Sequence, residues 1–309
     1  ALAAWRGAWP ESAGADIVPN SPLLFALHVF SFSTLGGNEF TVRIFTALAG
    51  VALMLSPLLF RDWLGRQRAL ILSLLLFFSP VLLISSRSDS PVVWSLLIVV
   101  VGLWALWRWW VTRQRGYSAL AVVCLLTVLL LTDPTGPLLA LILLGAAVFA
   151  RWRSSGDDDS LTTPLRESLS GGRWLRGLLF GALVVVLVST LFLTHPAGLS
   201  AVSGLLGALA RGLTTPQPGA PAAFPLLVTL FYEPALVLFG LLGALWLARG
   251  GRFGFVEWFC LGWILLATVV SVIYAGAGAD HALWLVLPLA VIVSRVVPEL
   301  LRDSDRLIW

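Results

Sequence analysis

Two short groups of charged residues in this 309-residue sequence have the types and spacing to bind a phosphate or to move a proton. Arg87 and Asp89 stand two residues apart, and Glu39 and Arg43 stand four apart, which suits an ion pair on a helix. A structural pair is our first interpretation of Glu39 and Arg43. The alternative is that an arginine here binds a lipid phosphate, because its planar guanidinium matches phosphate oxygens.

Further polar residues stand at the ends of apolar stretches and could join this chemistry. Any membrane protein places polar residues at such ends, which accounts for part of the set. All three histidines of the chain belong to it. The residues predicted to share one side of the membrane are Asp16, His28, Glu39, Arg43, Arg87, Asp89, Asp133, His195, Arg211, Tyr232, Glu233, Asp280 and His281.

The composition indicates a membrane protein. Hydrophobic residues make up 59% of the chain and charged residues 12%, well below the usual charged content of a soluble domain. We therefore predict a polytopic all-α protein in which residues 1–309 form a single transmembrane domain. We expect no nucleic-acid partner, because the basic residues stand at the ends of apolar stretches.

The cysteines and histidines do not indicate a cofactor site. Cys124 and Cys260 both lie inside apolar stretches, where they are expected to be small core residues. No spacing between the histidines suits a metal ion. The sequence therefore predicts no metal-binding residues, although it leaves a requirement for a divalent metal open.

Nine apolar stretches are candidate membrane spans, separated by polar connections. Pro80 predicts a kink within the second span, and residues 133–136 (DPTG) predict a turn between the fourth and fifth. The predicted spans are 41–60, 69–86, 91–110, 117–132, 137–150, 174–193, 234–248, 253–274 and 282–297.

The arginines fall unevenly on the two sides of a membrane crossed by these nine spans. The chain has no lysine, and sixteen of its twenty basic residues lie on one side. An excess of arginine in short loops marks the cytoplasmic side. We therefore predict the cytoplasmic membrane, with residue 1 outside and residue 309 in the cytoplasm. The four arginines of the outer side are Arg6, Arg43, Arg87 and Arg211.

Three segments lie outside the predicted spans. Residues 1–40 and 195–232 form outer segments, and residues 151–174 form a cytoplasmic loop. An interfacial helix is expected over residues 23–32, and apolar residues at helical spacing predict an amphipathic helix over residues 197–213. Because the chain starts outside without an initiator Met or a signal peptide, we expect a further segment upstream.

Short motifs in the chain carry a family resemblance. Six of them follow one order and spacing, and they resemble the first part of protein-mannosyltransferase-like glycosyltransferases, which have the GT-C fold. The aminoarabinose transferase of bacterial lipid A modification belongs to that group. Residues 231–234 (FYEP) and 238–243 (LFGLLG) extend the likeness to an uncharacterised prokaryotic branch. The six motifs are 21–24 (SPLL), 37–43 (GNEFTVR), Gly50, 64–65 (LG), 79–80 (SP) and 86–87 (SR).

The resemblance implies a glycosyltransferase that takes a sugar from a polyprenyl-phosphate carrier at the outer face. The acceptor would be a lipid, a glycan or a protein. In such enzymes a carboxylate is the general base, and cationic groups hold the donor phosphate. Asp16 and Asp89 are then the catalytic candidates. The candidate phosphate ligands are Arg43, Arg87 and Arg211, and the other outer-face candidates are Glu39, His195, Glu233, Asp280 and His281.

Three departures from the family pattern leave alternatives open: either the catalytic residues lie upstream of residue 1, or the activity has been lost. One departure is Asp133–Pro134, which replaces a polar pair usual at the fifth outer turn of the family. Asp16 lies beyond the position of the family's acidic motif, and Asp89 stands closer to Arg87 than the family's second acid does. The alternative is a catalytically inactive GT-C-like scaffold, an accessory subunit with protein partners in the membrane. Membrane lipids are expected partners in both cases. A transporter is disfavoured because the middles of the spans are almost free of charge.

Overall fold

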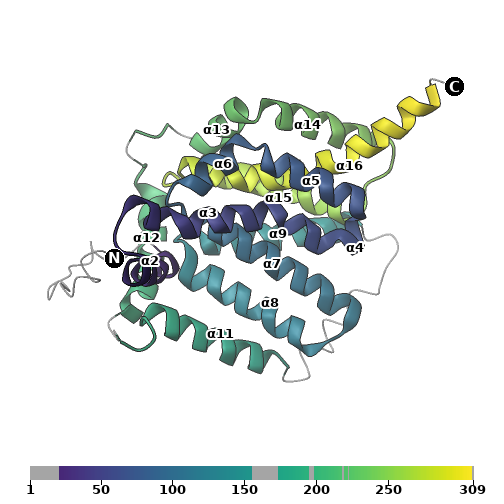
Figure 1. Ribbon diagram of the computed structural model, residues 1–309. Helices are drawn as coiled ribbons and strands as arrows, with labels where there is room; N and C mark the ends of the chain where they lie inside the picture. The colour runs from purple at the N-terminus through teal and green to yellow at the C-terminus, as the bar shows by residue number, and fades with distance from the viewer. Residues whose placement is uncertain (1–20, 155–172, 195–197, 218, 222, 308–309) are drawn as a thin grey trace. The chain divides into compact units, whose positions relative to one another are not determined.

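The computed structural model describes residues 21–154, 173–194, 198–217, 219–221 and 223–307, and these residues form helices and connections without a strand. Figure 1 shows this all-helical architecture, which confirms the predicted fold class. The elements are α2 (Pro22–Leu35), α3 (Glu39–Leu55), η2 (Ser56–Phe60), α4 (Arg61–Leu64), α5 (Arg66–Phe77), α6 (Pro80–Arg87), α7 (Pro91–Thr112), α8 (Arg115–Thr127), η3 (Val128–Thr132), α9 (Gly136–Arg153), α11 (Arg173–Ser189), α12 (Leu199–Thr214), α13 (Phe224–Tyr232), α14 (Pro234–Arg249), α15 (Phe255–Ile273), η6 (Ala279–Ala282) and α16 (Leu283–Leu307).

Most of the predicted spans coincide with helices that can cross a membrane. The predicted span 69–86 is the pair α5 and α6, which bends by 61° beside Pro80, as expected from that proline. The span 174–193 corresponds to the shorter apolar helix α11, and the span 234–248 corresponds to α14, which forms a pair with α13 bent by 95°. The remaining six correspond to the helical segments Glu39–Leu64, Pro91–Thr112, Arg115–Thr132, Gly136–Arg153, Phe255–Ile273 and Ala279–Glu299.

Proline and small polar residues determine where several helices begin. Pro22 and Pro91 occupy the first turns of α2 and α7, where proline costs no backbone hydrogen bond. Asn38 and Thr41 form a reciprocal cap at the start of α3, because each side chain accepts from the other's backbone N–H, at 2.9 and 3.0 Å. The motif 37–43 therefore encodes a helix start.

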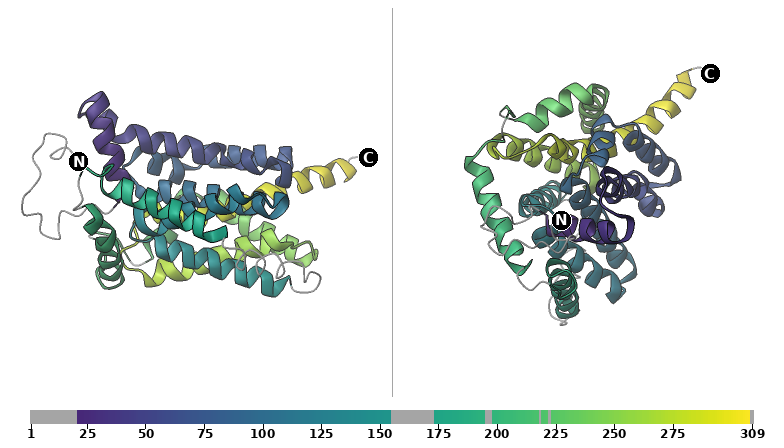
Figure 2. Two further views of the ribbon diagram at one scale, coloured as in Figure 1. Left: turned by 90° about the horizontal axis from the view of Figure 1, so that it is seen from below. Right: turned by 60° about the vertical axis from the view of Figure 1, so that its left-hand side comes forward.

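The described residues group into two compact units. The described residues of the first are 21–50, 86–140, 173–194 and 198–211. In it α8 packs against α7 on one side and α11 on the other (Figure 1). Figures 1 and 2 show α2 running across the direction of α3, and α12 across that of α11. The two predicted outer helices therefore form, and helices in this orientation can lie in the plane of a membrane interface.

The described residues of the second unit are 51–85, 141–154, 212–217, 219–221 and 223–307. Its central element is α16, which packs against α5, α14 and α15. Gly240 and Gly243 of α14 face Leu289 and Val296 of α16 without room for a Cβ atom. Small residues one helical turn apart allow close helix packing in membranes. The 238–243 motif of the sequence thus encodes a helix contact.

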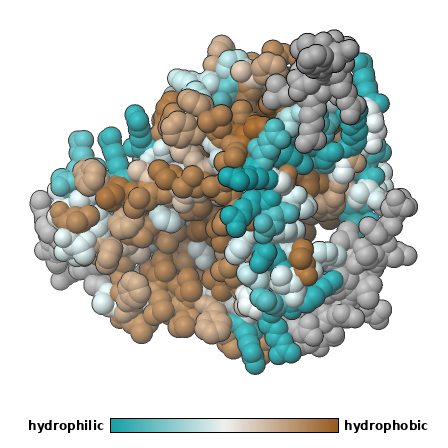
Figure 3. Space-filling model, turned by 45° about the vertical axis from the view of Figure 1, so that its right-hand side comes forward, coloured by the Kyte–Doolittle hydropathy of each residue, from teal (hydrophilic) through white to brown (hydrophobic). Residues whose placement is uncertain are grey.

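Much of the outward-facing surface is apolar. On α9 the exposed side chains of Leu141, Leu144 and Val148 recur at helical spacing on one face. Figure 3 shows brown apolar side chains gathered over a broad area, with teal hydrophilic side chains beside them. An apolar surface of this kind suits contact with lipid rather than water. The chain is therefore a multi-pass membrane protein.

The contact between α8 and α11 gives a stability prediction. A Cβ atom on Gly177 would lie 2.9 Å from Val122 Cβ and 3.2 Å from Ala119 Cα, so the helices approach too closely for a side chain. We expect Gly177→Val to destabilise the protein by about 1–3 kcal/mol through overpacking. The measurement is the thermal unfolding midpoint of the purified protein in detergent.

The matched control is Gly116→Val in the first turn of α8. Nothing lies within 4 Å of a Cβ atom built there, so this change is expected to leave the midpoint almost unaltered. Equal midpoints for Gly177→Val and the unmodified chain would contradict the close packing of α8 on α11.

Candidate functional site

A histidine–carboxylate pair lies in the first unit, at the end where α2, α3 and the α6–α7 turn come together. His28 Nε2 is 3.1 Å from Asp89 Oδ1 and also 3.1 Å from the carbonyl oxygen of Val42. Both neighbours are acceptors, so Nε2 carries a hydrogen that it donates to them. The pair joins α2 to the turn that follows α6, and the contact with Val42 joins it to α3.

The local sequence of α2 explains why His28 points this way. Leu24, His28, Ser31 and Phe32 form the buried side of the helix, and the His28 ring stacks on Phe32 with centroids 5.9 Å apart. Ser31 Oγ donates to the carbonyl of Thr41 at 2.7 Å. Two side chains of α2 therefore bond to consecutive carbonyls of α3, which fixes the imidazole in position.

Asp89 and the neighbouring arginines remain accessible. The Asp89 side chain is 43% exposed, although its histidine partner is buried. Arg87 ends α6 two residues earlier, and Arg43 follows Val42 in the first turns of α3. Both arginines are exposed, and neither forms an ion pair with any other described residue. The exposed groups at this end of the first unit are therefore the Asp89 carboxylate and the guanidinium groups of Arg43 and Arg87.

The ion pair expected between Glu39 and Arg43 is not present. Within the described part of the chain, no salt bridge joins them, and both side chains are exposed. A helical spacing of four residues permits such a pair, but in solvent it contributes little and does not hold two long side chains together. This leaves the alternative interpretation, in which Arg43 is available to an external anion.

Arg211 and Asp133 also belong to the first unit. Arg211 is exposed in the last turn of α12. Asp133 is buried in the predicted 133–136 turn, where Thr135 Oγ1 donates to its carboxylate and Gly136 N donates to its carbonyl at 2.9 Å. Asp133 thus stabilises the turn between η3 and α9.

Glu233 lies in the second unit, where it joins two helix breaks. Its carboxylate accepts hydrogen bonds from Ser79 Oγ and, at 3.2 Å, from the backbone N–H of Val81. Ser79 Oγ in turn accepts from Leu82 N at 3.2 Å, so Ser79 and Glu233 together cap α6. Glu233 itself precedes Pro234 at the 95° bend between α13 and α14. The carboxylate is buried and has a structural role here.

Asp280 and His281 form a second acid–histidine contact in the second unit. His281 Nδ1 lies 3.0 Å from Asp280 Oδ1 and 3.1 Å from the N–H of Gly278. That nitrogen cannot accept from Gly278 and donate to Asp280 at once, so the protonation of the ring selects between them. The His281 ring also packs edge-on against Trp284, with centroids 4.9 Å apart.

Two predicted candidates, Asp16 and His195, lie outside the described residues. His28 belongs to the predicted outer set, but its sequence context assigns it no catalytic or binding role. Its signal in the sequence is the spacing of Leu24, His28 and Phe32, which places an ionisable ring on an otherwise apolar helix face. Sequence alone could not show that Asp89, 61 positions later, is its partner.

Of the described residues, no three His, Cys, Asp or Glu side chains form a metal-binding group.

Comparison with solved structures identifies the fold. The chain is similar to ArnT from Cupriavidus metallidurans, both in the apo state and bound to undecaprenyl phosphate, with a TM-score of 0.62 and 16% sequence identity in each case. It has the GT-C fold of ArnT. The match covers 90% of this chain and 49% or 50% of the ArnT chain, so the chain spans about half the length of that protein.

The fold match confirms the resemblance inferred from the motifs. No family model matches the sequence, and no curated protein matches it either. At 16% identity the similarity establishes the architecture, and the roles of individual residues depend on the geometry described above.

The buried position of Glu233 gives a second stability prediction. Glu233→Ala removes the acceptor for Val81 N–H and Ser79 Oγ–H, and we expect a loss of about 1–3 kcal/mol because these groups stay buried without a partner. Glu233→Gln keeps an acceptor oxygen and should cost less. The thermal unfolding midpoint measures both, with exposed Glu39→Ala as the control. If Glu233→Ala unfolds at the same temperature as Glu39→Ala, the capping role is wrong.

Proposed function

We propose that this chain is a membrane glycosyltransferase that uses a sugar linked to a polyprenyl phosphate. The observation that carries the proposal is the GT-C fold, which matches a protein solved with undecaprenyl phosphate bound. The sugar is transferred to a hydroxyl group of a lipid, glycan or protein acceptor. The His28–Asp89 pair of the first unit supports the proposal because it offers an exposed carboxylate held by a buried imidazole.

Asp89 is the general base in this proposal. The acceptor oxygen forms a bond to the anomeric carbon of the sugar, and its proton passes to the Asp89 carboxylate. The bond between the anomeric carbon and the phosphate oxygen breaks, and its electron pair leaves with the polyprenyl phosphate. His28 positions the carboxylate by donating from Nε2, and its contact with Val42 keeps the ring in place.

Arg43 and Arg87 hold the donor phosphate. Both are exposed and free of ion pairs with other described residues, so their guanidinium groups are available to phosphate oxygens. Negative charge accumulates on the phosphate as the sugar leaves, and cationic groups lower the energy of that transition state. Arg211 and Glu39 remain further candidates at the surface of the first unit.

The proposed topology places this chemistry outside the cytoplasm. Most arginines follow the positive-inside pattern, and Arg43 and Arg87 are exceptions to it. We propose the cytoplasmic membrane as the location, with residue 1 outside and residue 309 in the cytoplasm. A polyprenyl-phosphate donor would then be reached from the outer leaflet.

Binding of undecaprenyl phosphate tests the proposal. We expect the purified chain to bind this lipid, and Arg43→Gln or Arg87→Gln to raise the Kd about tenfold, the cost of one charge-assisted hydrogen bond. Native mass spectrometry over a lipid titration measures the Kd. Asp89→Asn should leave binding intact, because its predicted defect lies in proton removal.

Arg61→Gln is the matched control, since Arg61 is also an exposed arginine and belongs to the second unit. Unchanged binding in the Arg43 and Arg87 variants would remove these residues from the donor site. No binding of undecaprenyl phosphate by the unmodified chain would contradict the enzyme and favour the accessory-subunit alternative.

A further inference from the structure

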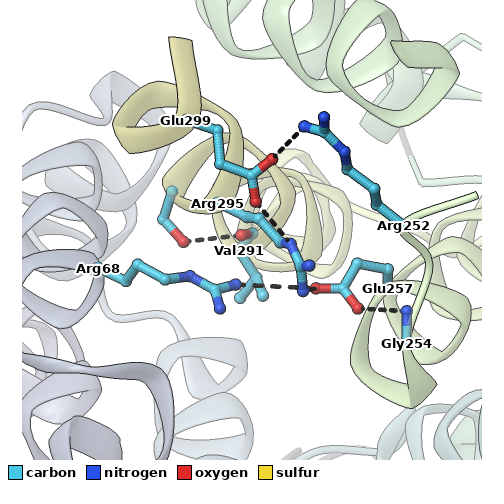
Figure 4. Close-up of polar contacts among 8 residues, drawn as sticks. Arg68, Arg252, Gly254, Glu257, Val291, Arg295 and Glu299 are labelled. Atoms are coloured by element: carbon cyan, nitrogen blue, oxygen red, sulfur yellow. Dashed lines mark hydrogen bonds and ion pairs between the residues drawn. The ribbon is translucent and has the colours of Figure 1, made fainter. Parts of the chain in front are cut away.

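A network of five charged side chains lies in the second unit and shares no residue with the set assigned to sugar transfer (Figure 4). Glu257, in the first turn of α15, is its centre. Arg295 Nη1 of α16 lies 2.5 Å from Glu257 Oε1, and Arg68 Nη2 of α5 lies 3.8 Å from the same oxygen. The backbone N–H of Gly254 donates to Glu257 Oε2 at 2.9 Å.

A second carboxylate extends the network. Glu299 of α16 lies 3.1 Å from Arg252 Nη1 and 3.4 Å from Arg295 Nε. Three arginines thus share two glutamates, and the network carries a net charge of +1. Glu257 is only 4% exposed, and its partners Arg68 and Arg295 are 24% and 25% exposed, so water reaches this part of the network only in part. An uncompensated charge in such a place is costly and favours an anionic partner.

The arginines also have unused hydrogen-bonding capacity. Arg68 Nε is buried, and it has no hydrogen-bond partner within the described part of the chain. Arg295 Nε is close to Glu299, but without hydrogen-bond geometry. A guanidinium has five N–H donors, and phosphate oxygens match its fork. The arginines are still reachable, since the side chains of Arg68 and Arg252 are 24% and 49% exposed.

An apolar stripe runs along α5 from the arginine-rich start of that helix. Leu70, Leu74 and Phe77 are exposed and share the face of α5 on which Arg66 lies, whereas Arg68 lies on the opposite face with the buried Leu72 and Leu76. The stripe indicates that α5 borders lipid, and a phospholipid supplies an anionic phosphate at the ends of membrane helices, where these arginines lie. A phosphodiester carries one negative charge, equal to the excess of the network.

We propose that Arg68, Arg252 and Arg295 bind the phosphate of an anionic phospholipid. Basic sites between membrane helices are a known means of binding lipid headgroups. The bound lipid neutralises the network and strengthens the contact among α5, α15 and α16. This site is independent of the proposed transferase site, because none of its residues belongs to the His28–Asp89 end.

The experiment uses the full chain, purified and delipidated in detergent. Phosphatidylglycerol, phosphatidylcholine and inorganic phosphate are titrated separately, and native mass spectrometry gives the Kd of each lipid. Thermal unfolding follows all three additions. We expect phosphatidylglycerol to bind about tenfold more tightly than phosphatidylcholine and to raise the unfolding midpoint, while inorganic phosphate raises it little.

Arg68→Gln should abolish the preference for phosphatidylglycerol, whereas Arg61→Gln, an exposed arginine outside the network, should keep it. Arg68→Lys retains the charge and is the variant to use if Arg68→Gln does not fold; losing the planar fork should weaken phosphatidylglycerol binding at least about threefold. Equal affinity for the two lipids, or an unchanged preference in the folded Arg68 variant, would overturn the proposal. Equal stabilisation by inorganic phosphate would also overturn it, since the site would then bind a free ion.

Discussion

A helix that breaks inside a bilayer must have its open peptide groups satisfied by the protein, because no water is available there. The second unit meets this requirement at the α5–α6 bend with two side chains, Glu233 and Ser79. Glu233 stands at the bend between α13 and α14, and it accepts from Ser79 and Val81 at the bend between α5 and α6. The buried Glu233 carboxylate thus accepts hydrogen bonds from the α5–α6 bend, while Glu233 itself lies at the α13–α14 bend. It therefore connects the four helices α5, α6, α13 and α14.

The same physical constraint places the remaining charges at the ends of helices. In the second unit, Arg68, Glu257 and Arg295 join the ends of α5 and α15 to α16. In the first unit, His28 and Asp89 join α2 to the turn before α7. The arginines and glutamates of the second unit pair mainly with one another and keep spare N–H donors that suit an anion, whereas the His28–Asp89 end of the first unit leaves a carboxylate and two arginines exposed. This difference is why we assign catalysis to the first unit and lipid binding to the second.

Local sequence signals predicted most of the fold. The apolar stretches, the bend beside Pro80 and the 133–136 turn follow from hydropathy and from proline and glycine chemistry, which act over a few residues. The amphipathic helix expected near residues 197–213 is α12. These features need no knowledge of distant contacts, so a single sequence suffices to find them.

The contacts of the candidate site were less predictable, because they join distant segments. Asp89 was identified as a candidate, but its partner His28 comes from a helix 61 positions earlier. Glu233 was expected to be available at the outer face and instead caps a helix that begins over 150 positions before it. For Glu39 and Arg43 the sequence predicted a contact that is absent. Their spacing on one helix is correct, but the two side chains are solvated and do not pair.

A structure of the chain in lipid nanodiscs with undecaprenyl phosphate tests the central claim most directly. We predict lipid phosphate within hydrogen-bonding distance of the Arg43 or Arg87 guanidinium, on the side of the first unit that carries Asp89. Phosphate density beside Arg68 and Arg295 alone, with the surroundings of His28 and Asp89 unoccupied, would contradict the assignment of sugar transfer to the first unit.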